Sequence, residues 1–231
     1  GKIKGGKRYM KKKTLTAAIA LVLIVALAVG ATYAYLTAKT GTVTNTFVVG
    51  KVIDPGDEKN PNFVLDESKA VRSSDGTYTL DAAQRVKAND YTVVPGVNLP
   101  KDPTVEIKNQ DNVAGGSDYY LFVKVTAGAA YQAGEDGTKL LSYTVDTDKW
   151  LKLDVAGEEV YVYAADGKTA SANHGNFAAT GILKADAQGN AITVVNADLS
   201  GLTKENSALT FQAYVCQSAG LTPAEAYAAA K

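Results

Sequence analysis

The sequence predicts an all-β protein: a jelly-roll-type β-sandwich with a short C-terminal helix, preceded by an N-terminal hydrophobic helix. Three observations lead to this fold class. After residue 45, apolar residues recur with a period of two almost throughout, which indicates strands. Turn-forming residues divide this pattern into about ten short strands, as in sandwiches. Finally, Thr222, Pro223 and Glu225 form a capping box with proline at the first helical position, ahead of an alanine-rich end.

The period-two stretches give the expected strands in order. They are 46–52, 77–80, 104–109, 119–127, 140–145, 150–155, 160–164, 177–184, 191–196 and 208–216. Alternate residues from Tyr119 to Val125 share one face, and 208–216 alternates in the same way. Residues 94–103 contain three prolines, which remove backbone donors and exclude a central strand. We expect one domain over 46–231, with loop-and-hairpin insertions at about 54–93 and 165–200.

Residues 1–34 have the pattern of a leader and secretory signal, with the natural start at Met10. The basic cluster 11–13 precedes an apolar run over 15–30, and the small residues Thr32 and Ala34 follow. We therefore expect signal cleavage between Ala34 and Tyr35. The alternative is an uncleaved membrane anchor, since ~20 apolar residues span a bilayer. In either case this segment provides the chain's contact with a membrane.

Charge and cysteine content exclude several classes of function. Seven of the 24 basic residues and none of the 24 acidic residues lie in residues 1–34, so the remainder carries 17 basic and 24 acidic residues. An acidic domain has no electrostatic reason to bind nucleic acid. With Cys216 as the sole cysteine of the sequence, no disulfide forms within the chain.

The residues that follow the signal resemble the TasA/camelysin family of exported Gram-positive proteins, which a SipW-type signal peptidase cleaves. Ala38 stands where that family usually has an acidic residue. The chain also matches the family at a Lys-Asp-Pro segment over 101–103 and at its C-terminal strand and helix. The other matching positions are Thr44, Asn45, Thr46, Phe47, Gly50, Val52, Pro95 and Gly96.

The resemblance implies a secreted structural protein of the extracellular matrix or cell surface. Relatives form biofilm matrix fibres by donor-strand exchange, in which the segment freed by signal cleavage completes a sheet in the next subunit. The implied partners are further copies of the chain in a head-to-tail homopolymer, the SipW-type peptidase and an accessory matrix protein. The implied donor strand comprises Tyr35, Leu36, Thr37, Ala38, Lys39, Thr40, Gly41, Thr42 and Val43.

Two alternatives come from other classes of function. The first is a camelysin-like extracellular metallopeptidase, but a helical zinc protease site needs two histidines and the sequence has only His174. Cys216 has no histidine nearby in sequence to activate it. We therefore expect neither an enzyme nor a cofactor, with weak calcium binding left open at the acidic turns 54–58 and 146–148. The second alternative is a monomeric, surface-anchored β-domain that binds a partner.

Overall fold

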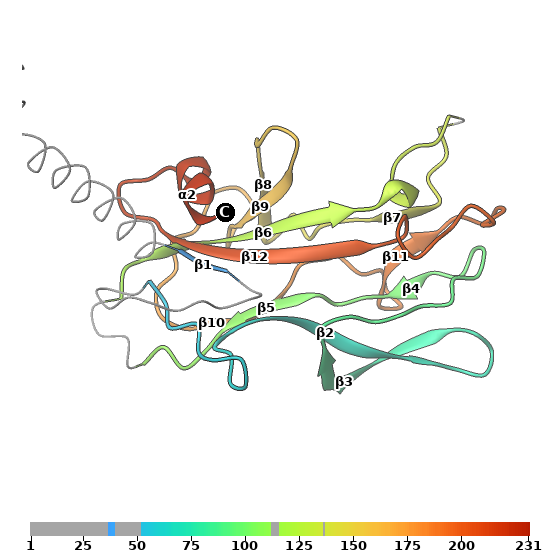
Figure 1. Cartoon of the computed structure of the whole chain (residues 1–231), viewed down its shortest axis with the longest axis horizontal. Helices are drawn as coiled ribbons and strands as arrows, with labels where there is room; N and C mark the ends of the chain where they lie inside the picture. The colour runs from blue at the N-terminus through green and yellow to red at the C-terminus, as the bar shows by residue number, and fades with distance from the viewer. Residues whose placement is uncertain (1–36, 40–51, 112–115, 136) are drawn as a thin grey trace, which may run out of the picture.

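The computed structural model describes residues 37–39, 52–111, 116–135 and 137–231 and shows antiparallel sheets with one short C-terminal α-helix (Figure 1). The largest sheet has the strand order β1 (Thr37–Lys39), β12 (Leu209–Gln217), β6 (Tyr119–Ala127), β9 (Glu159–Tyr163) and β8 (Trp150–Leu153). A four-stranded sheet has the order β10 (Phe177–Gly181), β5 (Thr104–Ile107), β2 (Phe63–Arg72) and β3 (Tyr78–Val86). A three-stranded sheet has the order β4 (Leu99–Pro100), β11 (Asn190–Val194) and β7 (Leu141–Tyr143).

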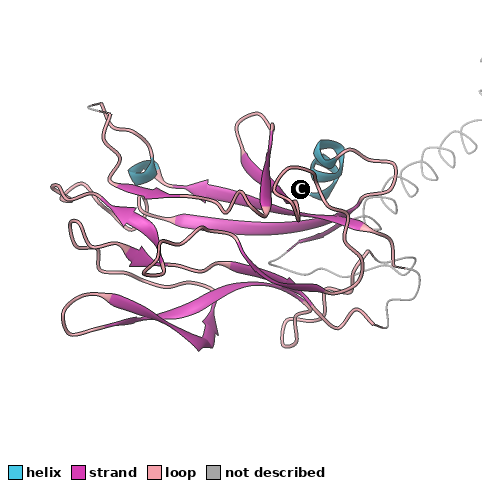
Figure 2. Ribbon diagram, turned by 180° about the vertical axis from the view of Figure 1, so that it is seen from behind, coloured by secondary structure: helices cyan, strands magenta, loops and turns pink. Residues whose placement is uncertain are grey.

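The five-stranded and four-stranded sheets face each other as two layers, which both views show (Figures 1 and 2). Their inner faces supply one hydrophobic core, in which Val105 of β5 and Leu121 of β6 are fully buried. Trp150 closes one side of this core, because its indole nitrogen donates to the Gly181 carbonyl oxygen at 2.8 Å. This arrangement makes the protein β-sandwich-like.

Two smaller apolar clusters lie outside the inter-sheet core. The helix α2 (Pro223–Ala230) lies on its outer face, where Tyr227 packs 5.6 Å from the rings of both Phe122 and Tyr214. The three-stranded sheet lies at the end away from α2, beside the short 3-10 helix η1 (Ala129–Tyr131) (Figure 1). The sandwich is therefore covered on one outer face and at one end.

Several expected elements are confirmed. The antiparallel all-β class is confirmed, and so is the C-terminal helix, which begins after Thr222 with both hydrogen bonds of the capping box. On β6, alternate residues from Tyr119 to Val125 do face the inter-sheet core. The opposite face of β6 is also buried, at Phe122, because α2 covers it.

The strand β2 was not expected from the sequence. This ten-residue strand lies within 54–93 and pairs with both β5 and β3, so it is a body strand of the four-stranded sheet. Its centre, Asp66–Lys69, is polar, yet Glu67 and Ser68 are buried. Their partners come from distant parts of the chain. Local hydrophobic periodicity therefore does not indicate this strand.

Candidate functional site

Three residues of the expected donor segment are described, and they form β1. Thr37 lies opposite Cys216 and Lys39 opposite Tyr214, in antiparallel register with β12. On its other side β12 pairs with β6 along its full length of nine residues. The structure therefore places this part of the segment against β12 of its own chain (Figure 1).

The other expected processing and motif positions fall outside the described residues, apart from Val52, Pro95 and Gly96. Those outside are Ala34, Tyr35, Leu36, Thr40, Gly41, Thr42, Val43, Thr44, Asn45, Thr46, Phe47 and Gly50. The expected N-terminal hydrophobic helix lies there too.

The strand β12 presents a different environment on each face. Its alternate residues from Leu209 to Val215 pack in the inter-sheet core, as the sequence pattern predicts. Tyr214 and Cys216 lie on the other face, beneath α2. The helix therefore covers the part of β12 that pairs with β1.

One carboxylate, Glu158, ties α2 to the sheet. It accepts hydrogen bonds from Lys124 Nζ at 2.8 Å, from the Tyr227 hydroxyl at 3.0 Å and from Lys231 Nζ at 3.3 Å. The hydrogen bond from Lys124, followed by that from Tyr227, lowers the pKa of Glu158 to about 2. The C-terminal helix is thus fixed to β6 and to the turn before β9.

The described chain resumes at Val52, and the side chain of Gln110 holds it there. Val52 and Ile53 are buried in the inter-sheet core. The amide of Gln110 accepts from the Asp54 N–H at 2.7 Å and donates to the Asp54 carbonyl at 2.8 Å. It also donates to the Lys108 carbonyl at 2.8 Å. The Gln110 side chain therefore satisfies backbone groups that a neighbouring strand would otherwise pair with.

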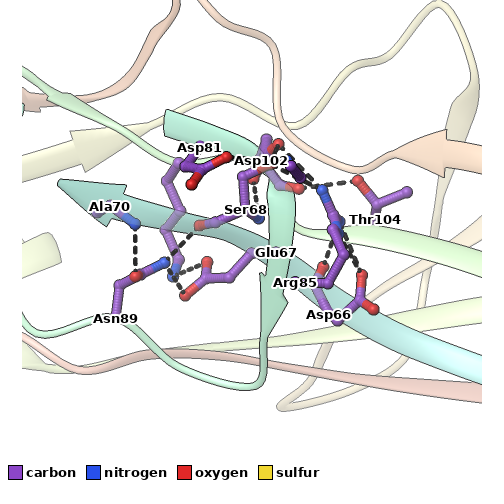
Figure 3. Close-up of polar contacts among 11 residues, drawn as sticks. Asp66, Glu67, Ser68, Ala70, Asp81, Arg85, Asn89, Asp102 and Thr104 are labelled. Atoms are coloured by element: carbon purple, nitrogen blue, oxygen red, sulfur yellow. Dashed lines mark hydrogen bonds and ion pairs between the residues drawn. The ribbon is translucent and has the colours of Figure 1, made fainter. Parts of the chain in front are cut away.

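The Lys101–Pro103 segment anchors the centre of β2 (Figure 3). Asp102 accepts from the Ser68 N–H at 2.7 Å and from the Ser68 hydroxyl at 2.6 Å. Lys101 forms a 2.5 Å ion pair with the buried carboxylate of Glu67. The segment therefore supplies the polar partners that allow β2 to be buried.

The strands β2 and β3 separate next to this network. Arg85 binds the Asp66 carboxylate through Nε at 2.9 Å and Nη2 at 2.7 Å (Figure 3). Arg85 Nη2 also donates to the Asp66 carbonyl at 3.2 Å, and Lys87 Nζ donates to the Leu65 carbonyl at 2.9 Å. Cationic side chains therefore occupy backbone acceptors where no strand pairing with β3 occurs.

Pro95 and Gly96 form the centre of a tight turn. The Val97 N–H donates to the Val94 carbonyl at 3.0 Å, and Gly96 has φ of 73°. Proline followed by a residue with positive φ is the arrangement of a type II turn, which favours glycine at the second position. The Gly96 N–H also donates to the Val195 carbonyl at 3.0 Å, so the turn is joined to the end of β11.

The residues considered for nucleophilic or metal chemistry have different surroundings. His174 is exposed, with Nδ1 3.0 Å from the Asp118 carboxylate. Cys216 is fully buried, and burial raises the pKa of its thiol to about 11. Within the described part of the chain, no three residues among His, Cys, Asp and Glu are grouped to hold a metal ion.

The carboxylates of the acidic turns bind other groups of the chain. Asp146 pairs with Lys149 at 3.4 Å, and Asp148 pairs with Lys184 at 3.2 Å. Asp57 Oδ1 accepts the N–H groups of residues 59 and 60 at 2.9 and 2.7 Å. The bonds of Asp57 are typical of Asx turns, so this carboxylate stabilises its own turn.

Among the residues with assigned positions, no helix has both the length and the apolar character needed to cross a membrane. Comparison with known proteins gave no match: no family model, no curated protein and no solved structure matches the chain.

The contacts of Gln110 and Glu158 were not expected from the sequence, because each joins residues that are far apart in the chain. Gln110 and Asp54 are 56 residues apart, and Glu158 and Tyr227 are 69 apart. Among the segments that supply such long-range partners, only residues 101–103 were indicated by the sequence, because they belong to the family resemblance. The pairing of β1 with β12 could be identified only from the register of the two strands in the structure.

Proposed function

We propose that the chain is a secreted structural protein whose copies assemble head to tail into a fibre of the extracellular matrix or cell surface of a Gram-positive bacterium. A SipW-type peptidase would cut between Ala34 and Tyr35, and the freed segment 35–43 would pair with β12 of the next copy. The observation that carries this proposal is the antiparallel pairing of β1 with β12. The signal-like residues 1–34 and the family resemblance support it.

The register gives the proposed donor a matching length. With Thr37 opposite Cys216, the same antiparallel register places Tyr35 opposite residue 218 and Val43 opposite residue 210. The segment would therefore extend along almost the whole of β12, Leu209–Gln217. Main-chain hydrogen bonds of an added strand supply affinity, and side chains at alternate positions supply register.

The same register pairs small residues with the core-facing side of β12. Positions 38, 40 and 42 are Ala, Thr and Thr, and they would lie opposite Val215, Ala213 and Phe211. Tyr35 and Leu36 would be the large apolar anchors at one end. Pairing would therefore depend mainly on the backbone.

A strand that pairs with its own subunit competes with the same strand from a neighbour. Exchange between copies is a head-to-tail contact that does not close on itself, so it propagates into a filament. Cleavage at Ala34 would couple export to assembly, because an uncut signal holds the segment at the membrane. In this proposal the body strands form a jelly roll, and an accessory matrix protein assists assembly.

A disulfide between Thr37→Cys and the native Cys216 tests the proposal directly. Opposed residues of an antiparallel pair have Cα atoms about 4.5–5.5 Å apart, which a disulfide spans. The protein would be secreted from a host with the matching peptidase, and cleavage would be checked by N-terminal sequencing. The matched control carries Thr37→Cys together with Cys216→Ala.

Oxidation before assembly should lock β1 within its own subunit and prevent filaments, and reduction should restore them. Oxidation after assembly should give covalent ladders on a non-reducing gel, and the control should give neither effect. Filaments that form from locked monomers, or whose crosslinks all lie within single chains, would refute exchange of this segment. Correctly cut protein that stays monomeric in both redox states would refute self-assembly in favour of a monomeric surface domain.

A further inference from the structure

A polar cavity of about 360 Å³ lies where the three-stranded sheet meets the five-stranded sheet. Its walls come from the η1 region, β7, the segment after β7, and the beginning of β9. Cavities of this size are at the lower end of the range for small-molecule sites. None of the residues that line the cavity belongs to β1 or β12.

The carboxylate of Glu159 organises the cavity. It accepts the hydroxyl hydrogen of Tyr143 at 2.7 Å through Oε2 and that of Tyr161 at 2.8 Å through Oε1. Glu159 and Tyr161 are two residues apart on β9, so they share a face of the strand. Burial, followed by the hydrogen bond to Glu159, raises the pKa of both tyrosines, which keeps their hydroxyl groups protonated.

This arrangement leaves hydrogen-bond acceptors available to a ligand. A carboxylate has about four lone-pair sites, of which the two tyrosines use two. Each tyrosine oxygen has given its hydrogen to Glu159 and can still accept. A ligand that reaches this group must therefore bring hydrogen-bond donors.

The rest of the lining adds donors and further acceptors. Gln132 supplies an amide, and Ser142, Thr144 and Thr147 supply hydroxyl groups. Lys139 is exposed at the cavity, and no ion pair of Lys139 occurs in the described part of the chain. With one glutamate and one lysine, the formal charge of the lining is zero.

These features select a neutral ligand whose groups both donate and accept. A simple ammonium ion would meet the lysine, and a simple carboxylate would meet Glu159. A zwitterion would use the two charged side chains but would leave the amide and hydroxyl groups of the lining without a partner in the ligand. Sugar hydroxyls donate to the Glu159 group and accept from Gln132, Lys139 and the serine and threonine hydroxyls.

We propose that this cavity binds a neutral saccharide through Glu159 and the hydroxyl groups of Tyr143 and Tyr161. The test is a titration of the isotope-labelled full chain with maltose, cellobiose and diacetylchitobiose, followed by backbone amide NMR. Glycine, butylamine and glucuronate are the zwitterionic, cationic and anionic comparison probes. At least one neutral disaccharide should give saturable shifts at the amides of residues 139–147 and 159–161.

Three variants locate the site. Glu159→Gln and Tyr143→Phe should each weaken disaccharide binding about tenfold or more, because the first replaces an acceptor oxygen with an amide group that only donates and the second removes a hydroxyl group. Tyr143→Phe keeps the ring and leaves the fold testable if Glu159→Gln destabilises it. The control is Glu158→Gln, the adjacent carboxylate, which binds Lys124 and Tyr227 instead and should leave binding unchanged.

The proposal is overturned if no disaccharide produces saturable shifts at these amides, or if a charged or zwitterionic probe binds there more tightly than every disaccharide. It is also overturned if disaccharide binding survives both Glu159→Gln and Tyr143→Phe in folded protein.

Discussion

The ion pair between Lys101 and Glu67 offers a quantitative test of how β2 is stabilised. The two side chains are 12% and 5% exposed, and their charged atoms are 2.5 Å apart. Replacing Lys101 by Met keeps an apolar side chain of similar length but removes the cation. Asn89 Nδ2, 3.0 Å from Oε1, then remains as the side-chain partner of the Glu67 carboxylate.

Breaking a buried pair from one side costs about 3–5 kcal/mol, because a desolvated charge loses its counterion. Since both side chains retain some exposure, we expect Lys101→Met to lower the free energy of unfolding by about 3 kcal/mol. The double variant with Glu67→Gln should cost clearly less than the two single changes added together. Urea unfolding of the full chain at pH 7 measures all four proteins of this cycle.

The cost should be specific to a buried ion pair. The control is Lys204→Met, which removes a partner of Asp90 from a pair that is 82% and 90% exposed, and it should change stability little. The pair does not stabilise β2 if Lys101→Met lowers the free energy of unfolding by less than about 1 kcal/mol. The same holds if the effects of the two single variants simply add in the double variant.

Three further predictions concern Gln110, Glu158 and Cys216. Gln110→Leu should lower the free energy of unfolding, measured in urea, by about 2–4 kcal/mol. The reason is that three hydrogen bonds of a side chain that is 5% exposed are lost. An unchanged free energy of unfolding would contradict this role of Gln110. Since the pKa of Glu158 is lowered from 4.5 to about 2, its ion pairs should contribute stability above pH 4.5 and lose it as the pH falls towards 2. Glu158→Gln should therefore flatten the acid side of the stability profile, and an unchanged profile would refute the assignment. Cys216 should resist a thiol reagent at pH 8 in the native protein and react with it in urea. Rapid labelling of Cys216 in the native protein would contradict its burial.

Sequence patterns predicted the elements whose signal is local. The alternation in β6 and β12 specifies which residues face the inter-sheet core, and the Thr222–Glu225 box marks the start of α2. The strand β2 shows the limit of such patterns. Its buried Glu67 is acceptable because Lys101, 34 residues away, and Asn89, 22 residues away, supply partners.

The candidate site was predictable to a smaller degree. The segment 35–43 could be proposed from resemblance, but its pairing with β12 is a matter of register between residues about 180 positions apart. The cavity around Glu159 could not be predicted, because Tyr143 reaches it from another sheet. Hydrogen bonds between distant side chains leave no periodic trace in a sequence.

The point where β2 and β3 separate, at Leu65 and Asp66 of β2, is called the fork here. It has a consequence for the shape of any assembly. Exposed strand edges are the usual templates for unwanted sheet growth. At this fork the Leu65 and Asp66 carbonyls already accept from Lys87 and Arg85, so an incoming chain would first have to displace two cations. Growth by strand addition is thereby disfavoured on the four-stranded sheet at this point. A polymer that extends through β12 would then lengthen in one direction without side branches arising at the fork.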